Sequence, residues 1–195
     1  VKVGGASLGI SVDHQGQRIF VADWYENTVA VFDSTTLERL HTITVGNSPS
    51  GMVVSPDDQW LYVANRMDDS ISQIDLHKYS IRNTTKVGKH PFGIALNSDG
   101  SKLYTANVES DDVSVLEAGH LKRLNTVKVG ARPYALAVTA DGKHIFVTNQ
   151  DDSTLSVIDA ASNQPIATIA VGDKPEGISY SATLQRLLVA NWMDS

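Results

Sequence analysis

The stretch Val87–Asn107, VGKHPFGIALNSDGSKLYTAN, decides the fold, because the chain repeats its pattern without insertion. Its glycine, its proline and its final asparagine each recur every 42 residues. The glycines are Gly4, Gly46, Gly88, Gly130 and Gly172, the prolines are Pro49, Pro91, Pro133 and Pro175, and the asparagines are Asn65, Asn107, Asn149 and Asn191. Self-similarity at a period of about 40 to 45 residues indicates a propeller or a solenoid.

Within each unit, apolar residues alternate with period two, and turn sequences separate the alternating stretches. In the second unit this pattern predicts strands at Ser50–Ser55, Trp60–Asn65, Ser70–Asp75 and Ile81–Val87. On the second of these strands Leu61 and Val63 face one side, while Tyr62 and Ala64 face the other. Both sides are apolar, which is typical of a sheet covered on two faces by neighbouring sheets. The sequence therefore predicts an all-β β-propeller with four-stranded blades of 42 residues.

Two further residue patterns support this architecture. The predicted first strands carry a small residue at one position, which suits a crowded place near a propeller axis; these residues are Gly51, Gly93, Ala135 and Gly177. The asparagine that ends each second strand, replaced by Asp23 in the first unit, is expected to hydrogen-bond its own local backbone where the chain leaves the sheet.

The length of 195 residues corresponds to a little over four and a half such blades. We expect a single propeller domain over residues 1–195 that starts and stops inside units, with Val1–Val3 in the position of a fourth strand. Such a domain would be part of a longer protein that supplies the remaining blades, because open sheet edges are a liability that propellers avoid.

Composition narrows the classes of partner and cofactor. A net charge of −6 and a pI near 5.4 argue against a nucleic-acid groove, which is normally basic. The chain has no cysteine, so it offers no thiolate metal ligand and no Cys-x-x-Cys-His haem attachment. No apolar run approaches the roughly 18 residues of a membrane span. The sequence thus predicts no bound cofactor, no nucleic acid and no membrane-spanning segment.

Three strings carry a family resemblance: YVAN at Tyr62–Asn65, YTAN at Tyr104–Asn107 and FVTN at Phe146–Asn149, each preceded by VG-x-x-P. They resemble the YVTN-type β-propeller repeat. The resemblance implies a propeller of seven blades, related to the propeller subunits of quinone-cofactor amine dehydrogenases and to surface-layer propeller proteins of bacteria and archaea. It also implies a periplasmic or extracellular location. It implies little about activity, because this architecture hosts many functions.

In a propeller, the loops that join strand four to the next strand one share a face with the loops that join strands two and three. Aromatic side chains, arginine and methionine on those loops are residue types that binding sites use. The predicted binding residues are Trp24, Tyr25, Arg66, Met67, His90, Phe92, Glu109, Arg132, Tyr134, Lys174, Glu176 and Trp192. They predict recognition of a protein partner or a small ligand on this loop face.

Catalytic and metal sites find less support. The acidic pairs Asp68-Asp69, Asp111-Asp112 and Asp151-Asp152 lack the alternating ligands of a calcium loop, which favours a role in turns and predicts no metal site. No Gly-x-Ser-x-Gly motif and no phosphate-binding glycine loop occurs, so no catalytic residue is predicted.

These observations favour a non-catalytic binding or scaffold module over an enzyme. One alternative, from the resemblance alone, is the propeller subunit of a quinone- or haem-dependent periplasmic oxidoreductase. A third is a lactonase-like metal-dependent hydrolase, ranked last because the sequence shows no clustered Glu, Asn and Asp ligands near the axis.

Overall fold

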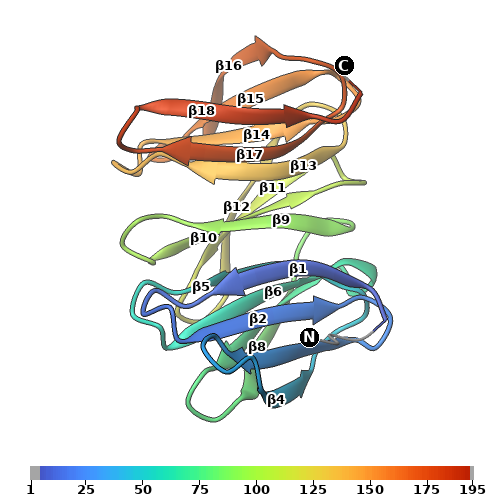
Figure 1. Cartoon of the computed structure of the whole chain (residues 1–195). Helices are drawn as coiled ribbons and strands as arrows, with labels where there is room; N and C mark the ends of the chain where they lie inside the picture. The colour runs from blue at the N-terminus through green and yellow to red at the C-terminus, as the bar shows by residue number, and fades with distance from the viewer. Residues whose placement is uncertain (1–4, 194–195) are drawn as a thin grey trace. The chain divides into compact units, whose positions relative to one another are not determined.

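The computed structural model describes residues 5–193, which form eighteen strands and one short 3-10 helix, η1 (Arg66–Asp68). The chain is all-β, as predicted, and every sheet is antiparallel (Figure 1). Val1–Val3 and Gly4, which the sequence places at the start of the first unit, lie outside the described residues. The described helical segment is too short and too polar to cross a membrane.

The chain divides into two compact units, and the first is Val1–Pro91. It holds two four-stranded sheets whose strands follow sequence order. The first sheet contains β1 (Ser7–Val12), β2 (Arg18–Asp23), β3 (Thr28–Asp33) and β4 (Arg39–Thr44), and the second contains β5 (Pro49–Val54), β6 (Trp60–Asn65), β7 (Ser70–Asp75) and β8 (Ser80–Lys86). The strands of the second sheet start and end within one residue of their predicted bounds, so the period-two pattern located them correctly.

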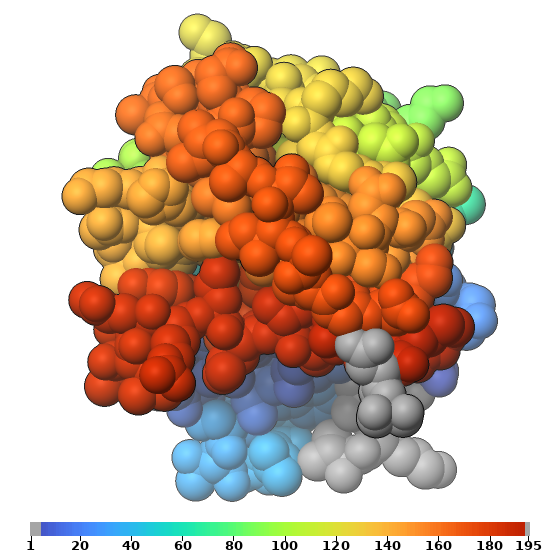
Figure 2. Space-filling view, turned by 90° about the horizontal axis from the view of Figure 1, so that it is seen from above, coloured from blue at the N-terminus to red at the C-terminus, as the bar shows by residue number. Residues whose placement is uncertain are grey.

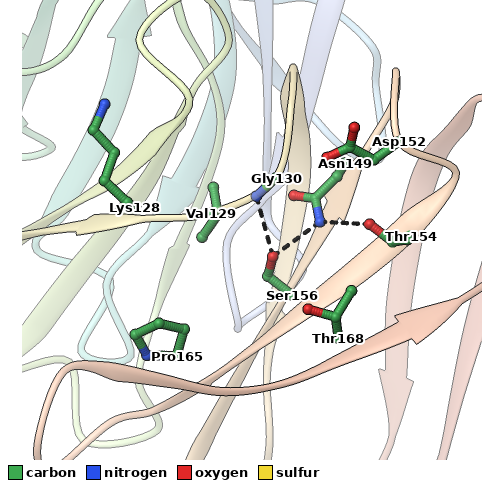
Figure 3. A pocket seen from close by; sticks show the side chains of 9 residues that line it. All are labelled: Lys128, Val129, Gly130, Asn149, Asp152, Thr154, Ser156, Pro165 and Thr168. Atoms are coloured by element: carbon green, nitrogen blue, oxygen red, sulfur yellow. Dashed lines mark hydrogen bonds between the residues drawn. The ribbon is translucent and has the colours of Figure 1, made fainter.

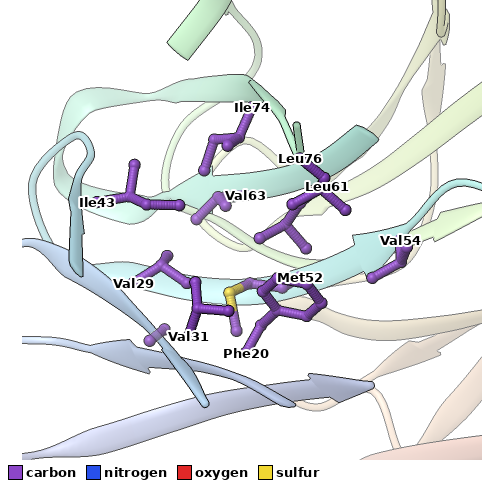
Figure 4. Packing of buried hydrophobic residues seen from close by; sticks show 11 residues of the cluster. Phe20, Val29, Val31, Ile43, Met52, Val54, Leu61, Val63, Ile74 and Leu76 are labelled. Carbon is purple, nitrogen blue, oxygen red and sulfur yellow. The ribbon is translucent and has the colours of Figure 1, made fainter. Parts of the chain in front are cut away.

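The core of the first unit lies between its two sheets (Figure 4). Phe20 and Val31 from the first sheet pack with Met52, Leu61 and Ile74 from the second. The four residues on the two faces of β6 are at most 1% exposed, which confirms that both faces of this strand are covered. Full burial of an aliphatic or aromatic side chain contributes roughly 1.5–3 kcal/mol, so covering both faces is the main stabilisation of the sheet.

The second unit, Phe92–Ser195, holds three sheets. The first contains β9 (Pro91–Leu96), β10 (Lys102–Asn107), β11 (Asp112–Glu117) and β12 (Lys122–Lys128). The second contains β13 (Pro133–Val138), β14 (His144–Asn149), β15 (Thr154–Asp159) and β16 (Gln164–Ala170). The third contains β17 (Pro175–Ser181) and β18 (Arg186–Asn191). Tyr104, Val113 and Ile145 belong to its core. Figure 2 shows the β16–β18 region, in orange to red, on the surface, where Ile166 is 55% exposed.

At the recurring small residue of the first strand, the backbones of neighbouring first strands pack directly against each other. A Cβ added at Gly93 would lie 2.6 Å from the carbonyl oxygen of Tyr134 on β13. In the first unit, a Cβ added at Gly9 would overlap the carbonyl oxygen of Ser50 on β5. At Gly9 and Gly93 neighbouring first strands therefore approach so closely that there is no room for a side chain, which confirms the predicted crowding at Gly93.

The prediction for the asparagines that end the second strands was wrong. Asn65 and Asn149 are fully buried and reach across to the third strand instead of to their own backbone. The Asn65 side-chain amide donates to the hydroxyls of Ser70 and Ser72, at 3.1 and 2.9 Å. Asp23, by contrast, behaves as predicted, because it accepts hydrogen bonds from the N–H groups two and three residues ahead.

Candidate functional site

Backbone hydrogen bonds tie two kinds of loop together in several blades. We call them the 4–1 loop, which joins a fourth strand to the next first strand, and the 2–3 loop, which joins second and third strands. In the blade of β5–β8, the Arg66 N–H donates to Ser48 O at 3.1 Å. The same bond recurs from Gln150 to Arg132 and from Trp192 to Lys174, each at 3.0 Å. In these three blades the two loops therefore share one face.

Each 4–1 loop also has one residue in the left-handed region immediately before its proline. These residues are Ser48, His90, Arg132 and Lys174, with φ between 52° and 54°. The N–H of Ser48 donates to Asn27 Oδ1 at 2.9 Å, and that of Arg132 donates to Asp111 Oδ1 at 2.9 Å. Since four different side chains share this backbone, the fold fixes the conformation and leaves the side chain free to vary.

The acidic pairs of the 2–3 loops hold the 4–1 loops in place. Asp69 Oδ1 accepts the His90 N–H at 2.8 Å. Asp68 Oδ2 accepts the Asn47 N–H, and Asp152 Oδ2 accepts the Ala131 N–H, both at 2.7 Å. These carboxylates therefore have the structural role that the sequence favoured, although they act on a neighbouring loop. Within residues 5–193, no three His, Cys, Asp or Glu side chains gather in an arrangement that could hold a metal ion.

In the first unit the structure places five predicted binding residues on these loops. Trp24 and Tyr25 follow β2, Arg66 and Met67 lie in η1, and His90 lies between β8 and β9. Tyr25 is 73% and Met67 55% exposed, whereas the other three are half-buried. The two most accessible side chains thus stand at the tips of successive 2–3 loops.

In the second unit the structure brings several predicted residues into contact. The rings of Phe92 and Tyr134 lie 4.1 Å apart. Asp151 Oδ1 lies 2.7 Å from Lys174 Nζ, and Asp151 Oδ2 lies 3.7 Å from Arg132 Nε. Together with Gln150 and Glu176, described next, these residues form what we call the Asp151 cluster.

Gln150 completes this cluster, because its side-chain amide donates to Glu176 Oε1 at 2.8 Å. Neither Gln150 nor Asp151 was among the predicted binding residues. Gln150 and Asp151 occupy the same positions of the 42-residue repeat as Trp24 and Tyr25. Comparison of one repeat with another would therefore have identified them. Of the two remaining predicted residues, Glu109 lies exposed on the 2–3 loop between β10 and β11, and Trp192 lies exposed directly after β18.

The ion pairs of the Asp151 cluster orient side chains more than they stabilise the fold. The side chains of Lys174, Arg132 and Asp151 are 36%, 46% and 41% exposed. Ion pairs at such exposure contribute about 0–1 kcal/mol each, because water screens them. The ion pairs of the cluster therefore present a positioned carboxylate and two cations to solvent.

A cavity of about 540 Å³ lies beside the turn at Gly130 (Figure 3). Asn149 donates to Thr154 and Ser156, each at 2.9 Å, and Ser156 accepts the Gly130 N–H at 3.3 Å. A Cβ at Gly130 would lie 2.6 Å from Asn149 and from Asp152, which explains the glycine that recurs at this position. These bonds tie β15 to the turn, so the polar lining of this cavity serves the fold.

Comparison with known protein families identifies the class of fold to which this architecture belongs. The family described as "Lactonase, 7-bladed beta-propeller" matches residues 34–118. Fold and family match together define the chain as a β-propeller protein, with about four and a half four-stranded blades, consistent with part of a seven-bladed propeller. No curated protein matches the sequence.

Solved structures agree on the fold. Hydrazine synthase from Kuenenia stuttgartiensis superposes with a TM-score of 0.86 at 22% identity, over 90% of this chain and 52% of its own. A functionally unknown protein from Desulfotomaculum acetoxidans DSM 771 gives 0.83 at 14% identity, over 99% of this chain and 68% of its own. The Cps50 (Swd1) β-propeller domain of Myceliophteria thermophila gives 0.83 at 16% identity, over 97% and 64%. This chain thus spans about half the length of the hydrazine synthase chain, and identities this low show the fold alone.

Proposed function

We propose that the chain is a non-catalytic recognition module that binds a protein partner through its 4–1 and 2–3 loops. One observation carries this proposal: a repeated hydrogen-bond frame holds a different side chain in each blade. At the position before the proline the frame holds Ser48, His90, Arg132 and Lys174 in turn. A rigid frame lowers the entropy cost of binding, and variation on it allows the surface to be specific.

The chemistry of the loops suits a protein surface. Exposed Tyr25 and Met67 supply apolar contact area, and the Phe92–Tyr134 pair supplies a half-buried aromatic edge. Arg132 is the residue type that interfaces favour for polar anchoring. By this proposal the protein needs no cofactor, and the family resemblance favours a periplasmic or extracellular setting.

The test uses the left-handed position of the 4–1 loops. Arg132→Gly combined with Lys174→Gly removes two side chains, while the backbone N–H and C=O groups of the frame remain. Glycine adopts this conformation without strain, so stability should change by no more than about 1 kcal/mol. Ser48→Gly is the matched control, because it changes the same backbone position without removing a charge.

A partner is first isolated with the complete protein as bait, and the binding of the purified partner is then measured by calorimetry. The double variant should weaken binding by about tenfold or more, since interface anchors contribute on the order of 2 kcal/mol. Ser48→Gly should bind normally. Full affinity in the double variant, or capture of a small molecule with no protein, would contradict the proposal.

The family match over residues 34–118 favours a second candidate, hydrolysis of a lactone. If this candidate is correct, the purified protein should open small-ring lactones faster than buffer alone, and a chelator should abolish that activity. Release of acid at the buffer rate across a lactone panel would count against it. The oxidoreductase alternative predicts a coloured partner or a redox-active visible band in the purified complex.

A further inference from the structure

One position of the repeat carries two aromatic residues and a carboxylate in the second unit. It is the residue after the recurring proline, and it holds Phe92 on β9, Tyr134 on β13 and Glu176 on β17. In the first unit Ser50 holds this position, and its buried hydroxyl lies 3.2 and 3.1 Å from two backbone carbonyl oxygens. The fold therefore accepts a small polar residue here, and it does not require rings or a carboxylate.

The three side chains come from adjoining strands. The rings of Phe92 and Tyr134 lie 4.1 Å apart with an angle of 33° between their planes. Strand β13 also lies beside β17, so it stands between β9 and β17. Because Phe92 covers one face of the Tyr134 ring, the opposite face lies on the side of Glu176. All three residues are half-buried, so a partner can still reach them.

A buried amide holds the Glu176 carboxylate in place. Gln150 is 7% exposed, and its side chain donates to Glu176 Oε1 at 2.8 Å. Its backbone N–H donates to Arg132 O, two residues before Tyr134, so Gln150 links the loop that precedes Tyr134 to Glu176. No other repeat of this chain has glutamine and glutamate at these two positions. The bond is thus an addition to the frame that the blades share.

The charge around Glu176 favours a cationic ligand. Both cations of the surrounding loops lie against Asp151, whose oxygens are 2.7 Å from Lys174 Nζ and 3.7 Å from Arg132 Nε. Within residues 5–193, no cation forms an ion pair with the Glu176 carboxylate. Against these two cations, the loops between the strands of the second unit carry five carboxylates: Glu109, Asp111, Asp151, Asp152 and Asp173. A positive group that approaches Glu176 therefore meets a net negative field.

We propose that the Tyr134 ring and the Glu176 carboxylate bind an arginine side chain of the protein partner. A guanidinium is planar, stacks on an aromatic face and donates several N–H groups to a carboxylate. A carboxylate has about four acceptor sites, so Glu176 can accept these bonds while it keeps the bond from Gln150. This inference rests on the proposed function, because it names the side chain that the loop face recognises.

Small probes test the inference on the complete protein without any partner. Affinities are measured by saturation-transfer NMR titration with N-acetylarginine methylamide, its citrulline analogue and its glutamate analogue. Citrulline has nearly the shape of arginine but no charge. We expect the arginine probe to bind, and the other two to bind about tenfold more weakly or not at all. Absence of arginine binding, or equal binding of the citrulline probe, overturns the inference.

Two carboxylate variants locate the site. Glu176→Gln removes the charge but keeps an oxygen that accepts the bond from Gln150, so the variant should fold and bind the arginine probe about tenfold more weakly. Asp173→Asn is the matched control, because it removes an exposed charge from the same 4–1 loop. Water and salt screen such a charge, so the control should weaken binding by no more than about twofold. Equal effects of the two variants overturn the inference.

Two ring variants test the stacking. Tyr134→Phe keeps the aromatic face and should bind the arginine probe within about twofold of the parent. Tyr134→Leu removes the face and should weaken binding about three- to tenfold, as expected for a cation held over an aromatic ring. Urea melts check that both variants are folded. Equal arginine affinity in Tyr134→Leu and Tyr134→Phe overturns the stacking on this ring.

The failure of this inference can be distinguished from the failure of the proposed function. An arginine probe that the parent binds and Glu176→Gln does not bind supports the inference, whether or not a protein partner is found. A partner that loses affinity in the variant Arg132→Gly with Lys174→Gly supports the proposed function. If Glu176→Gln binds both that partner and the arginine probe as the parent does, the inference is overturned and the proposed function stands.

Discussion

Gly93→Ala tests the backbone packing on which the architecture depends. The added methyl group would lie 2.6 Å from Tyr134 O and 2.8 Å from Ala135 Cα, and both atoms belong to the backbone of β13. Backbone atoms cannot rotate out of the way as a flexible side chain can. The two strands must therefore move apart.

Two opposing contributions give the expected size of the effect. Overpacking of a close contact costs about 1–3 kcal/mol. Alanine also restricts the unfolded chain more than glycine does, which raises the free energy of unfolding by about 0.4–1 kcal/mol. We expect Gly93→Ala to lower the free energy of unfolding by about 1–2 kcal/mol.

Gly5→Ala is the control, because the equivalent positions of other repeats carry side chains, as at Asn47 and Ala131. A Cβ added at Gly5 meets no atom within 4 Å. Only the unfolded-state contribution remains, so the variant should be as stable as the parent or slightly more stable. Urea denaturation of the complete protein measures both variants, with an unchanged m value as the check on two-state behaviour. Equal effects at the two positions would refute the close approach of the first strands.

Two further predictions concern single polar groups. Tyr104→Phe should raise the free energy of unfolding by roughly 1 kcal/mol in urea melts, because it removes an unpaired buried hydroxyl, whereas Tyr62→Phe should lower it slightly. Burial opposes ionisation of Asp13, but hydrogen bonds from the Arg18 side chain and backbone outweigh it, so the pKa of this carboxyl lies below its ordinary value of 3.8. The unfolded state then binds more protons, so this stabilisation is complete above the ordinary pKa and is lost as the pH falls through the lower, folded value. Asp13→Asn should flatten the acid side of the stability profile measured by urea melts, and an unchanged profile would speak against this account.

Much of the fold could be predicted from the sequence, because each blade obeys the same local rules. Alternation along β6 located a strand that is covered on both faces, and the recurring Gly-x-x-Pro located the 4–1 loops. The buried asparagines were mispredicted because a local rule for strand ends ignored the third strand, whose hydroxyls accept their amide hydrogens.

The candidate sites were less predictable, because each depends on what one blade has and another lacks. The loop face could be inferred from topology, yet the role of Asp151 between Lys174 and Arg132 required the distances between their side chains.

A repeat protein offers a physical basis for finding sites that a single-copy fold lacks. Every blade must satisfy the same backbone, so a change that weakens one copy without compensation stands out against the others. Asp58, Leu76 and Gln73 stand out in this comparison, because the next two blades have glycine, alanine and valine at these positions. Asp58 accepts the N–H groups of His14 and Gln15, and Gln73 donates to the Tyr62 hydroxyl at 3.4 Å. The polar changes in the blade of β5–β8 are therefore matched by hydrogen bonds that the side chains of glycine and valine cannot make.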